Sequence, residues 1–225
     1  MKMIAVIDYK AGNLTSVVKA LRFLLADNPN ATEIRVTQNP EEVLRAEKIV
    51  LPGVGHFQAT QLLKDLGLTE AIREAVSKDT PGGTPFLGIC VGLQWLYAGS
   101  TEAPETAGLG HFPGMVERFP ATHQGVELKS PHVGWNSLEG IRPDSRLLAG
   151  VPSGSFVYFT HSWRAPLSQD TAAVTNYGGG FTAAVERGNV MGVQFHPEKS
   201  AETGLRVLKN FLELEPRMNA DQSKC

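Results

Sequence analysis

The sequence contains little cysteine and no long hydrophobic run. Only two cysteines, Cys90 and Cys225, occur in 225 residues and they stand far apart, so the disulfide framework typical of small secreted proteins is excluded. The apolar run near the start, residues 3–7, ends at Asp8 and is far shorter than the ~20 residues of a membrane span. We therefore expect a cytosolic protein with no membrane segment.

Basic clusters and the common metal and nucleotide motifs are also missing. The 21 Lys and Arg residues nearly balance the 23 Asp and Glu residues, giving a formal net charge of −2. The electrostatic field that attracts nucleic acid or anionic lipid is therefore absent, and we expect neither as a partner. No C-x-x-C, H-E-x-x-H or P-loop occurs, so we expect no metal and no cofactor.

What the chain does contain is an alternation of strand and helix patterns. Hydrophobic residues make up 42% of the sequence, which predicts one globular domain over residues 1–215, followed by a flexible tail over residues 216–225. The first half predicts strands at residues 3–7, 33–37, 48–51 and 85–89. Between and after them it predicts helices at residues 14–25, with Asn13 as N-cap, and at 40–46, 69–78 and 90–97. This order is typical of a parallel, doubly wound sheet.

The second half has a different texture. Short β-rich runs separated by Gly and Pro predict strands at residues 126–129, 134–138, 155–163, 172–177, 181–187 and 190–196. An amphipathic helix follows, with Leu205, Leu208 and Phe211 on one face. The predicted fold class is therefore α/β: an open, mostly parallel sheet flanked by helices, with a mixed or antiparallel β extension in the C-terminal half.

The segment Gly88-Ile-Cys-Val-Gly92 has the form G-x-nucleophile-x-G. It lies between a predicted strand and a predicted helix, which is the context in which such a turn exposes a nucleophile. Glycine on both sides lets the backbone fold tightly. A buried cysteine acting as a small hydrophobic side chain is the alternative, and the segment alone leaves both interpretations open.

The candidate base for Cys90 is His196. Pro197 keeps this segment out of a helix, and residues two apart in an extended chain point to the same side, so His196 and Glu198 should share a face. A carboxylate beside an imidazole orients it and stabilises its charged form. The alternative is a turn with an ordinary surface acid. We expect surface or loop roles for the histidines without such a partner, namely His56, His111, His123 and His132, whereas His161 lies in an apolar strand.

Backbone donors for an oxyanion are available in Pro52-Gly-Val-Gly55. This segment follows a strand that should neighbour the Cys90 strand, and the N–H of Val91 offers a further donor. The alternative is a simple turn between a strand and a helix. The glycine pair lacks the third glycine of a dinucleotide-binding motif.

Together, these three motifs resemble the signatures of the class I, triad-type glutamine amidotransferases, and their order and spacing match over most of the chain. Further segments are similar to the glutaminase subunits of imidazole glycerol phosphate synthase: Asp8-Tyr-Lys-Ala-Gly-Asn-Leu14, Pro131-His-Val-Gly-Trp-Asn136, Tyr158-Phe-Thr-His-Ser162 and His196-Pro-Glu-Lys-Ser200. The resemblance implies that Cys90 attacks the side-chain amide of glutamine, His196 relays protons and Glu198 orients the imidazole. Ammonia leaves, and water then releases glutamate from a thioester.

The same resemblance implies roles for further residues. It implies that Gly53, Gly55 and Val91 surround the oxyanion, and that the amino-acid end of glutamine is held by Gln94, Glu102, Ser162 and Trp163. Gln94 lies one helical turn beyond Cys90 and can face the same pocket, although an exposed helix position is the alternative. Trp163 stands where a tyrosine is usual, and His56 follows the glycine pair where a small residue is more typical.

A partner is also implied, because ammonia released into water would be protonated and lose its nucleophilicity. The resemblance implies a heterodimer with a (β/α)₈-barrel cyclase, and glutamine hydrolysis that is weak until a nucleotide occupies the cyclase. Candidates for the partner-facing surface are Trp135, Asn136, Tyr158 and Lys199, although Trp135 and Tyr158 also suit half-buried core positions. The alternatives are the glutaminase subunit of an anthranilate, aminodeoxychorismate or pyridoxal phosphate synthase, or a non-catalytic docking module of the same fold.

Overall fold

The computed structural model describes residues 2–11, 14–26, 32–77 and 83–215. Three expectations from the sequence lie wholly or partly outside these ranges: the N-cap at Asn13, the last residue of the helix predicted at 69–78, and the tail 216–225 that includes Cys225.

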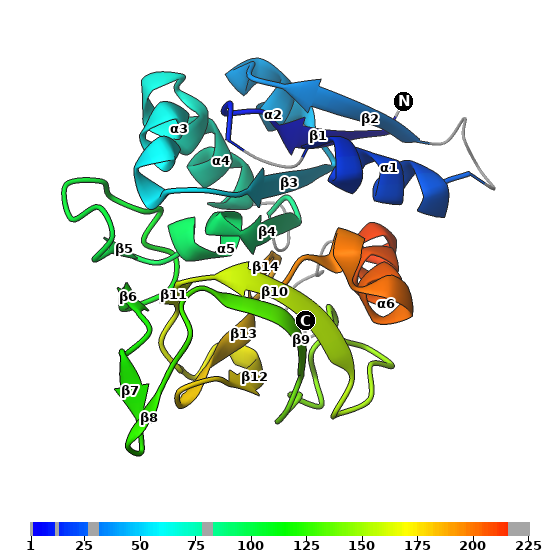
Figure 1. Ribbon diagram of the computed structural model, residues 1–225. Coiled ribbons are helices and arrows are strands. Elements are labelled where there is room, and N and C mark those ends of the chain that lie inside the picture. Colours follow the sequence, from blue (N-terminus) through cyan, green and yellow to red (C-terminus); the bar gives the residue numbers. More distant parts are fainter. Residues whose placement is uncertain (1, 12–13, 27–31, 78–82, 216–225) are drawn as a thin grey trace, which may run out of the picture.

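A seven-stranded sheet forms the centre of the molecule, in the order β12-β13-β14-β4-β3-β1-β2 (Figure 1). The five strands from β14 to β2 are parallel, β13 pairs antiparallel with β14, and β12 pairs antiparallel with β13. The bounds are β1 Lys2–Ile7, β2 Thr32–Thr37, β3 Lys48–Gly53, β4 Phe86–Cys90, β12 Thr171–Asn176, β13 Gly180–Arg187 and β14 Val190–Val193. Both expected parts of the fold, the parallel sheet and the mixed extension, are confirmed.

Both faces are covered at the centre of this sheet, which explains why β1, β3 and β4 are apolar without alternation. In β1, Ile4 and Val6 join one hydrophobic cluster with α1 (Leu14–Leu24) and α6 (Ala201–Glu213). Ala5 and Ile7 join a second cluster on the opposite face. Its helices are α2 (Pro40–Arg45), α3 (Gln61–Asp65), α4 (Leu68–Ser77) and α5 (Val91–Trp95).

Three small sheets surround this core. β9 (His132–Ser137) and β10 (Phe156–His161) form a curved antiparallel pair; β5 (Gly99–Ser100), β6 (Met115–Arg118) and β11 (Trp163–Arg164) form a second sheet; β7 (Thr122–His123) and β8 (Val126–Glu127) form a hairpin. The Tyr158 carbonyl accepts from the backbone N–H of His196 at 2.9 Å, and the Tyr158 N–H donates to Ser200 Oγ at 2.9 Å. β10 is therefore fixed beside the chain that follows β14.

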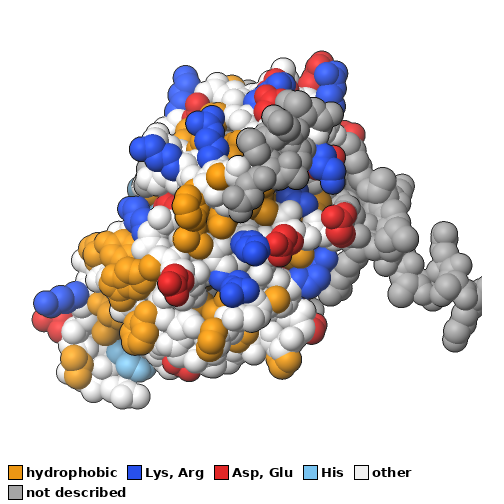
Figure 2. All heavy atoms as spheres, turned by 90° about the vertical axis from the view of Figure 1, so that its right-hand side faces the viewer, with side chains coloured by type: hydrophobic (Ala, Val, Ile, Leu, Met, Phe, Trp, Pro, Cys, Tyr) orange, Lys and Arg blue, Asp and Glu red, His pale blue; other side chains and the backbone are white. Residues whose placement is uncertain are grey.

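The surface seen from the side of α1 and α6 interleaves basic and acidic side chains, and hydrophobic side chains gather toward the edge where β9 and β10 lie (Figure 2). No helix in the described part of the chain is both long and apolar enough to cross a membrane.

The structure differs from the sequence prediction at element boundaries. The helix after Cys90 ends at Trp95 instead of Tyr97, and the strand predicted at 155–163 is split at Ser162 into β10 and β11. The last central strand ends at Val193 instead of His196, and Pro197 then begins a 3-10 turn, η2 (Pro197–Lys199). A second 3-10 turn, η1 (Phe57–Thr60), and α3 were not predicted.

Candidate active site

Cys90 lies at a strained turn between β4 and α5. Its φ of 54° and ψ of −106° place an L-residue in a region normally favoured by glycine. The flanking glycines are required by contact: a Cβ on Gly88 would overlap the Gly92 carbonyl oxygen, and one on Gly92 would overlap the Leu51 carbonyl oxygen. β3 pairs with β4 so that Gly53 lies opposite Cys90. The motif therefore brings the end of β3 and the cysteine together at one edge of the sheet.

His196 and Glu198 are in direct contact. Nδ1 of His196 lies 2.9 Å from Oε1 of Glu198, and each side chain is 1% exposed. The expected extended backbone over these residues is wrong, because Pro197–Lys199 forms the turn η2. His196 itself is extended, with φ −97° and ψ 97°, and Glu198 in the turn folds back onto its ring. Proline thus positions the carboxylate through a tight turn.

The electrostatic surroundings of His196 favour its charged form. Burial lowers the pKa of His196, but its interactions with Cys90 and Glu198 outweigh burial and raise the pKa to about 9. The second ring nitrogen, Nε2, is buried and makes no regular hydrogen bond within the described residues. A charged imidazole with one anchored and one uncommitted nitrogen is suited to transferring a proton.

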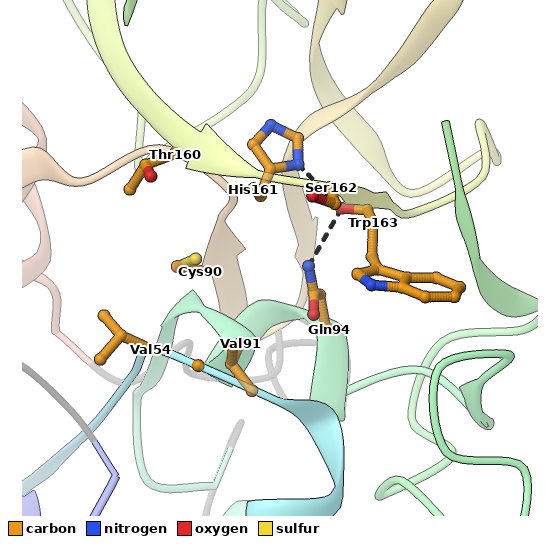
Figure 3. A pocket seen from close by; sticks show the side chains of 9 residues that line it. Val54, Cys90, Val91, Gln94, Thr160, His161, Ser162 and Trp163 are labelled. Carbon is orange, nitrogen blue, oxygen red and sulfur yellow. Dashed lines mark hydrogen bonds between the residues drawn. The ribbon is translucent and has the colours of Figure 1, made fainter. Parts of the chain in front are cut away.

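A pocket of about 160 Å³ opens in front of the Cys90 sulfur (Figure 3). Its walls come from the segment after β3, from α5, and from the end of β10 with the residues that follow it. The lining residues are Val54, Gly55, Cys90, Val91, Gln94, Thr160, His161, Ser162 and Trp163. Five of the residues implied to bind the oxyanion or glutamine therefore line one cavity with the sulfur: Gly55, Val91, Gln94, Ser162 and Trp163.

Gln94 is a fixed part of the pocket wall. It is 2% exposed, so the alternative of an exposed helix position is wrong. Its Nε2 donates to the Trp163 carbonyl at 3.1 Å and to Gln194 Oε1 at 3.2 Å. Gln194 in turn donates to Cys90 Sγ at 3.6 Å. Gln194 was not singled out from the sequence, although it lies two residues before His196 in an extended run, and that spacing could have identified it.

Glu102 and Gly53 do not line the pocket. Glu102 Oε2 accepts from the backbone N–H of Phe57 at 2.9 Å, and its Oε1 lies 3.9 Å from Nε2 of His56. His56 Nδ1 accepts from the Gln58 N–H and caps η1. Glu102 and His56 therefore hold the chain that follows Gly55 in place. Glu102 contacts this chain and does not itself line the pocket.

The outcome for His132 contradicts the expected surface or loop role, because it is 4% exposed and packs between Phe159 and Tyr177. Burial lowers the pKa of His132 to about 4 and that of His161 to about 3, so both are neutral at neutral pH. His161 Nδ1 faces the Trp163 carbonyl at 2.8 Å and must donate to it. His161 Nε2 then accepts from His132 Nδ1 at 3.3 Å. This pair fixes the Trp163 carbonyl that Gln94 also uses.

The outer face of the β9–β10 pair is apolar and exposed. Val133, Trp135 and Phe156 are 56%, 52% and 59% exposed, and Trp135 contacts the Tyr158 ring edge-on. Lys199 Nζ lies 5.8 Å from the centre of the Tyr158 ring. We call these five residues the outer face. Asn136 is directed elsewhere: its amide donates to the Asn176 carbonyl at 3.0 Å and lies 3.3 Å from His132 Nε2.

Within the described ranges, His, Cys, Asp and Glu side chains do not gather in groups of three or more that could hold a metal ion.

Comparisons with known proteins agree with this geometry. Residues 5–214 match the family model for class-I glutamine amidotransferases. A curated protein of Moorella thermoacetica, imidazole glycerol phosphate synthase subunit HisH, is 45% identical over 95% of this chain and 96% of its own length. The subunit of the same name from Methanosarcina acetivorans is 44% identical over 95% of this chain and its full length. The chloroplastic imidazole glycerol phosphate synthase hisHF of Arabidopsis thaliana is 40% identical, and the match covers 98% of this chain but 35% of that protein.

Solved structures share the fold at lower sequence identity. A crystal structure of a glutamine amidotransferase superposes with a TM-score of 0.69 at 21% identity, covering 93% of this chain and 97% of that one. A second one, from Thermotoga maritima, gives a TM-score of 0.54 at 18% identity, covering 94% of this chain and 82% of that one. These likenesses establish the fold.

Proposed function

This chain belongs to the class-I glutamine amidotransferase family, and we propose that it is the glutaminase subunit of an imidazole glycerol phosphate synthase. The family match spans residues 5–214, and curated subunits of that synthase from a bacterium and an archaeon are 45% and 44% identical to it over nearly the whole chain. The reaction is the hydrolysis of glutamine to glutamate and ammonia, and the ammonia is used by a partner subunit.

Cys90 is the proposed nucleophile. Its sulfur forms a bond to the amide carbon of glutamine, and the C–N bond then breaks as the leaving nitrogen takes the proton of His196 Nε2. Water attacks the resulting thioester, gives a proton back to His196 and releases glutamate. Glu198 holds Nδ1 of the imidazole at 2.9 Å, which leaves Nε2 facing the reaction. The pKa of about 9 for His196 means that the imidazole carries at neutral pH the proton that the leaving nitrogen needs.

The proposed oxyanion donors are backbone N–H groups of the Gly53–Gly55 segment and of Val91. Gly55 and Val91 line the pocket with Cys90, and Gly53 lies opposite Cys90 in the pairing of β3 with β4. Gly55 has a φ of +94°, which glycine adopts without strain, so this segment can present an N–H where other residues could not. Removing one such donor typically slows an acyl transfer by about 10²–10³-fold.

The amino-acid end of glutamine is proposed to lie against Gln94, Ser162 and Trp163. The Gln94 carbonyl oxygen remains available to a substrate ammonium group, since the amide nitrogen is committed to Trp163 and Gln194. Position 163 carries tryptophan instead of the usual tyrosine, which changes only the side chain. The backbone carbonyl of Trp163 is held in place by two donors, Gln94 and His161. We propose that Glu102 supports the site indirectly, through its hydrogen bond to Phe57.

The partner is proposed to be a cyclase subunit with a (β/α)₈ barrel, forming a heterodimer. The outer face carries three exposed apolar residues beside Tyr158 and Lys199, and Thr160, on the same side of β10, lines the pocket. A partner on this face would therefore lie next to the site where ammonia is released. In the Arabidopsis relative the matched region is 35% of a longer chain, which is consistent with a function that needs more than this domain.

The observation that carries the proposal is the His196–Glu198 pair, whose imidazole interacts with a strained cysteine that faces a pocket. The test is a glutamate-release assay on the wild type and Cys90→Ala, with and without a cyclase subunit and its nucleotide substrate. We expect stimulation by the loaded cyclase, and no glutamate release by the variant. Stimulation by a chorismate-using partner instead would assign the chain to a different synthase.

A further inference from the structure

A buried tyrosine hydroxyl beside the proposed oxyanion segment has no evident role in the resting fold. Tyr9, which follows β1, is 0% exposed and lies in the hydrophobic cluster around α4 and α5. Its hydroxyl is buried and has no hydrogen-bond partner within the described residues. Buried hydroxyl groups in native proteins are nearly always paired, so this one calls for a physical explanation.

The hydroxyl lies against the Cα of Gly53. A Cβ added to Gly53 would overlap the Tyr9 oxygen, and it would also lie 2.9 Å from Val91 Cβ and 3.0 Å from the Gly92 backbone nitrogen. The Tyr9 hydroxyl therefore reaches the point where the end of β3 meets the start of α5. Burial and the charge of Cys90 both raise the pKa of Tyr9, so its oxygen keeps its proton and acts as a donor.

A peptide group carries its N–H and its carbonyl on opposite sides. When the peptide after Gly53 turns its N–H toward the pocket, the Gly53 carbonyl must turn away from the pocket and needs a donor in the protein interior. A buried, protonated and uncommitted hydroxyl at the Gly53 Cα is such a donor. Glycine at position 53 accepts the change in ψ that this rotation requires without a steric penalty.

We propose that Tyr9 is a positioning residue, whose hydroxyl donates to the Gly53 carbonyl when the Gly53–Val54 peptide turns its N–H toward the oxygen of the tetrahedral intermediate. This inference rests on the proposed glutaminase function and adds a residue to it. The hydroxyl has no partner in the resting conformation and gains one during turnover. Its removal should therefore affect stability and catalysis in opposite directions.

The test uses Tyr9→Phe in the complete complex with the cyclase subunit and its nucleotide substrate. We expect the kcat of glutamate release to fall about tenfold, as for loss of one hydrogen bond made only in the transition state, with little change in the KM for glutamine. The thermal midpoint should stay the same or rise by about 2–4 °C, because a buried unpaired hydroxyl is removed. Alkylation of Cys90 by iodoacetamide should keep its rate, since the thiol is unchanged.

Tyr97→Phe is the matched control. Tyr97 is also 0% exposed in the same cluster, and its buried hydroxyl likewise has no hydrogen-bond partner among the described residues. The atoms nearest to a Cβ on Gly53 belong to Tyr9, Val91 and Gly92, and not to Tyr97. This variant should leave kcat unchanged. An unaltered kcat in Tyr9→Phe overturns the role of Tyr9, and so does a lowered midpoint together with a raised KM, which would indicate simple structural damage. Wild-type complex that releases no glutamate overturns the proposed function, and the role of Tyr9 with it.

Discussion

One methyl group added at Gly92 should reduce the activity of the protein much more than it reduces the stability of the fold. A Cβ there would overlap the carbonyl oxygen of Leu51 and lie 3.1 Å from its carbonyl carbon. Leu51 cannot recede, because β3 is held between β1 and β4, with Leu51 opposite Gly88. The start of α5 must therefore move away from β3 by roughly 1 Å to reach a normal contact distance.

The expected magnitudes follow from this displacement. Overpacking of a close contact destabilises the fold by about 1–3 kcal/mol, and replacing glycine by alanine in a helix stabilises it by about 1 kcal/mol. Gly92→Ala should therefore lower the free energy of unfolding by up to about 2 kcal/mol. For a chain of this size, that is a fall of up to about 8 °C in the thermal midpoint. A shift of about 1 Å in catalytic groups can cost about a hundredfold in rate. Because Cys90 and Val91 begin this helix, glutamate release should fall by that larger factor.

Calorimetry and the glutamate-release assay with the cyclase subunit measure the two effects on the same sample. Gly180→Ala is the control, since its Cβ would meet only ordinary contacts, at 3.4 Å from Val174 and 3.6 Å from Leu167. It should leave both quantities near wild type. Unchanged turnover in Gly92→Ala, whatever its midpoint, would refute the argument that the α5–β3 contact sets the position of the nucleophile.

Three further outcomes follow from the charges and the surface. The pKa of His196 is raised from 6.5 to about 9, so its contribution to the free energy of unfolding is complete below pH 6.5 and is lost as the pH rises through 9. Denaturant unfolding should show this loss in the wild type and not in His196→Gln. The pKa values of His132 and His161 are lowered to about 4 and about 3, so the contribution of these neutral rings to the free energy of unfolding should be full above pH 6.5 and fall as the pH drops toward 4. An NMR titration that shows either ring charged at pH 6 would contradict this. Trp135→Ala should weaken cyclase binding by about 5–30-fold, as measured by titration calorimetry. It should leave the thermal midpoint unchanged, because Trp135 is 52% exposed. An unchanged affinity would place the partner on another surface.

The sequence predicted the central sheet because local pattern and tertiary environment agree there. Strands buried on both faces are uniformly apolar, and the positions of β1, β3 and β4 follow from that pattern, whereas β2 is only partly buried and carries Glu33 and Arg35. The residues from Phe57 to Asp65 escaped prediction because their helices are four and five residues long, too short to establish a period. Ser162 interrupts an otherwise continuous β pattern, and nothing local indicates that the chain changes sheets there.

Site residues divide in the same way. Cys90, Gln94 and Gly55 belong to short motifs whose geometry is set by neighbours in sequence, and the structure places all three at one pocket. His132 could not be located from sequence, since its burial depends on Phe159 and Tyr177, which are distant in the chain. Glu102 was assigned to glutamine by resemblance, and its hydrogen bond from the N–H of Phe57 is a contact across 45 positions that no local pattern reveals.

Several departures from ordinary folding rules lie near the end of β4. Cys90 has a positive φ, and buried polar atoms of Tyr9, His196 and Glu198 lack hydrogen-bond partners within the described residues. Each feature is unfavourable for the resting fold, and each lies within the reach of the cysteine or of the segment beside it. Strain and unpaired polar groups persist where surrounding structure over-determines them, and here two hydrophobic clusters hold both faces of the sheet. A site that gains its missing hydrogen bonds only when a tetrahedral intermediate forms would bind that intermediate better than glutamine, and that difference is what accelerates the reaction.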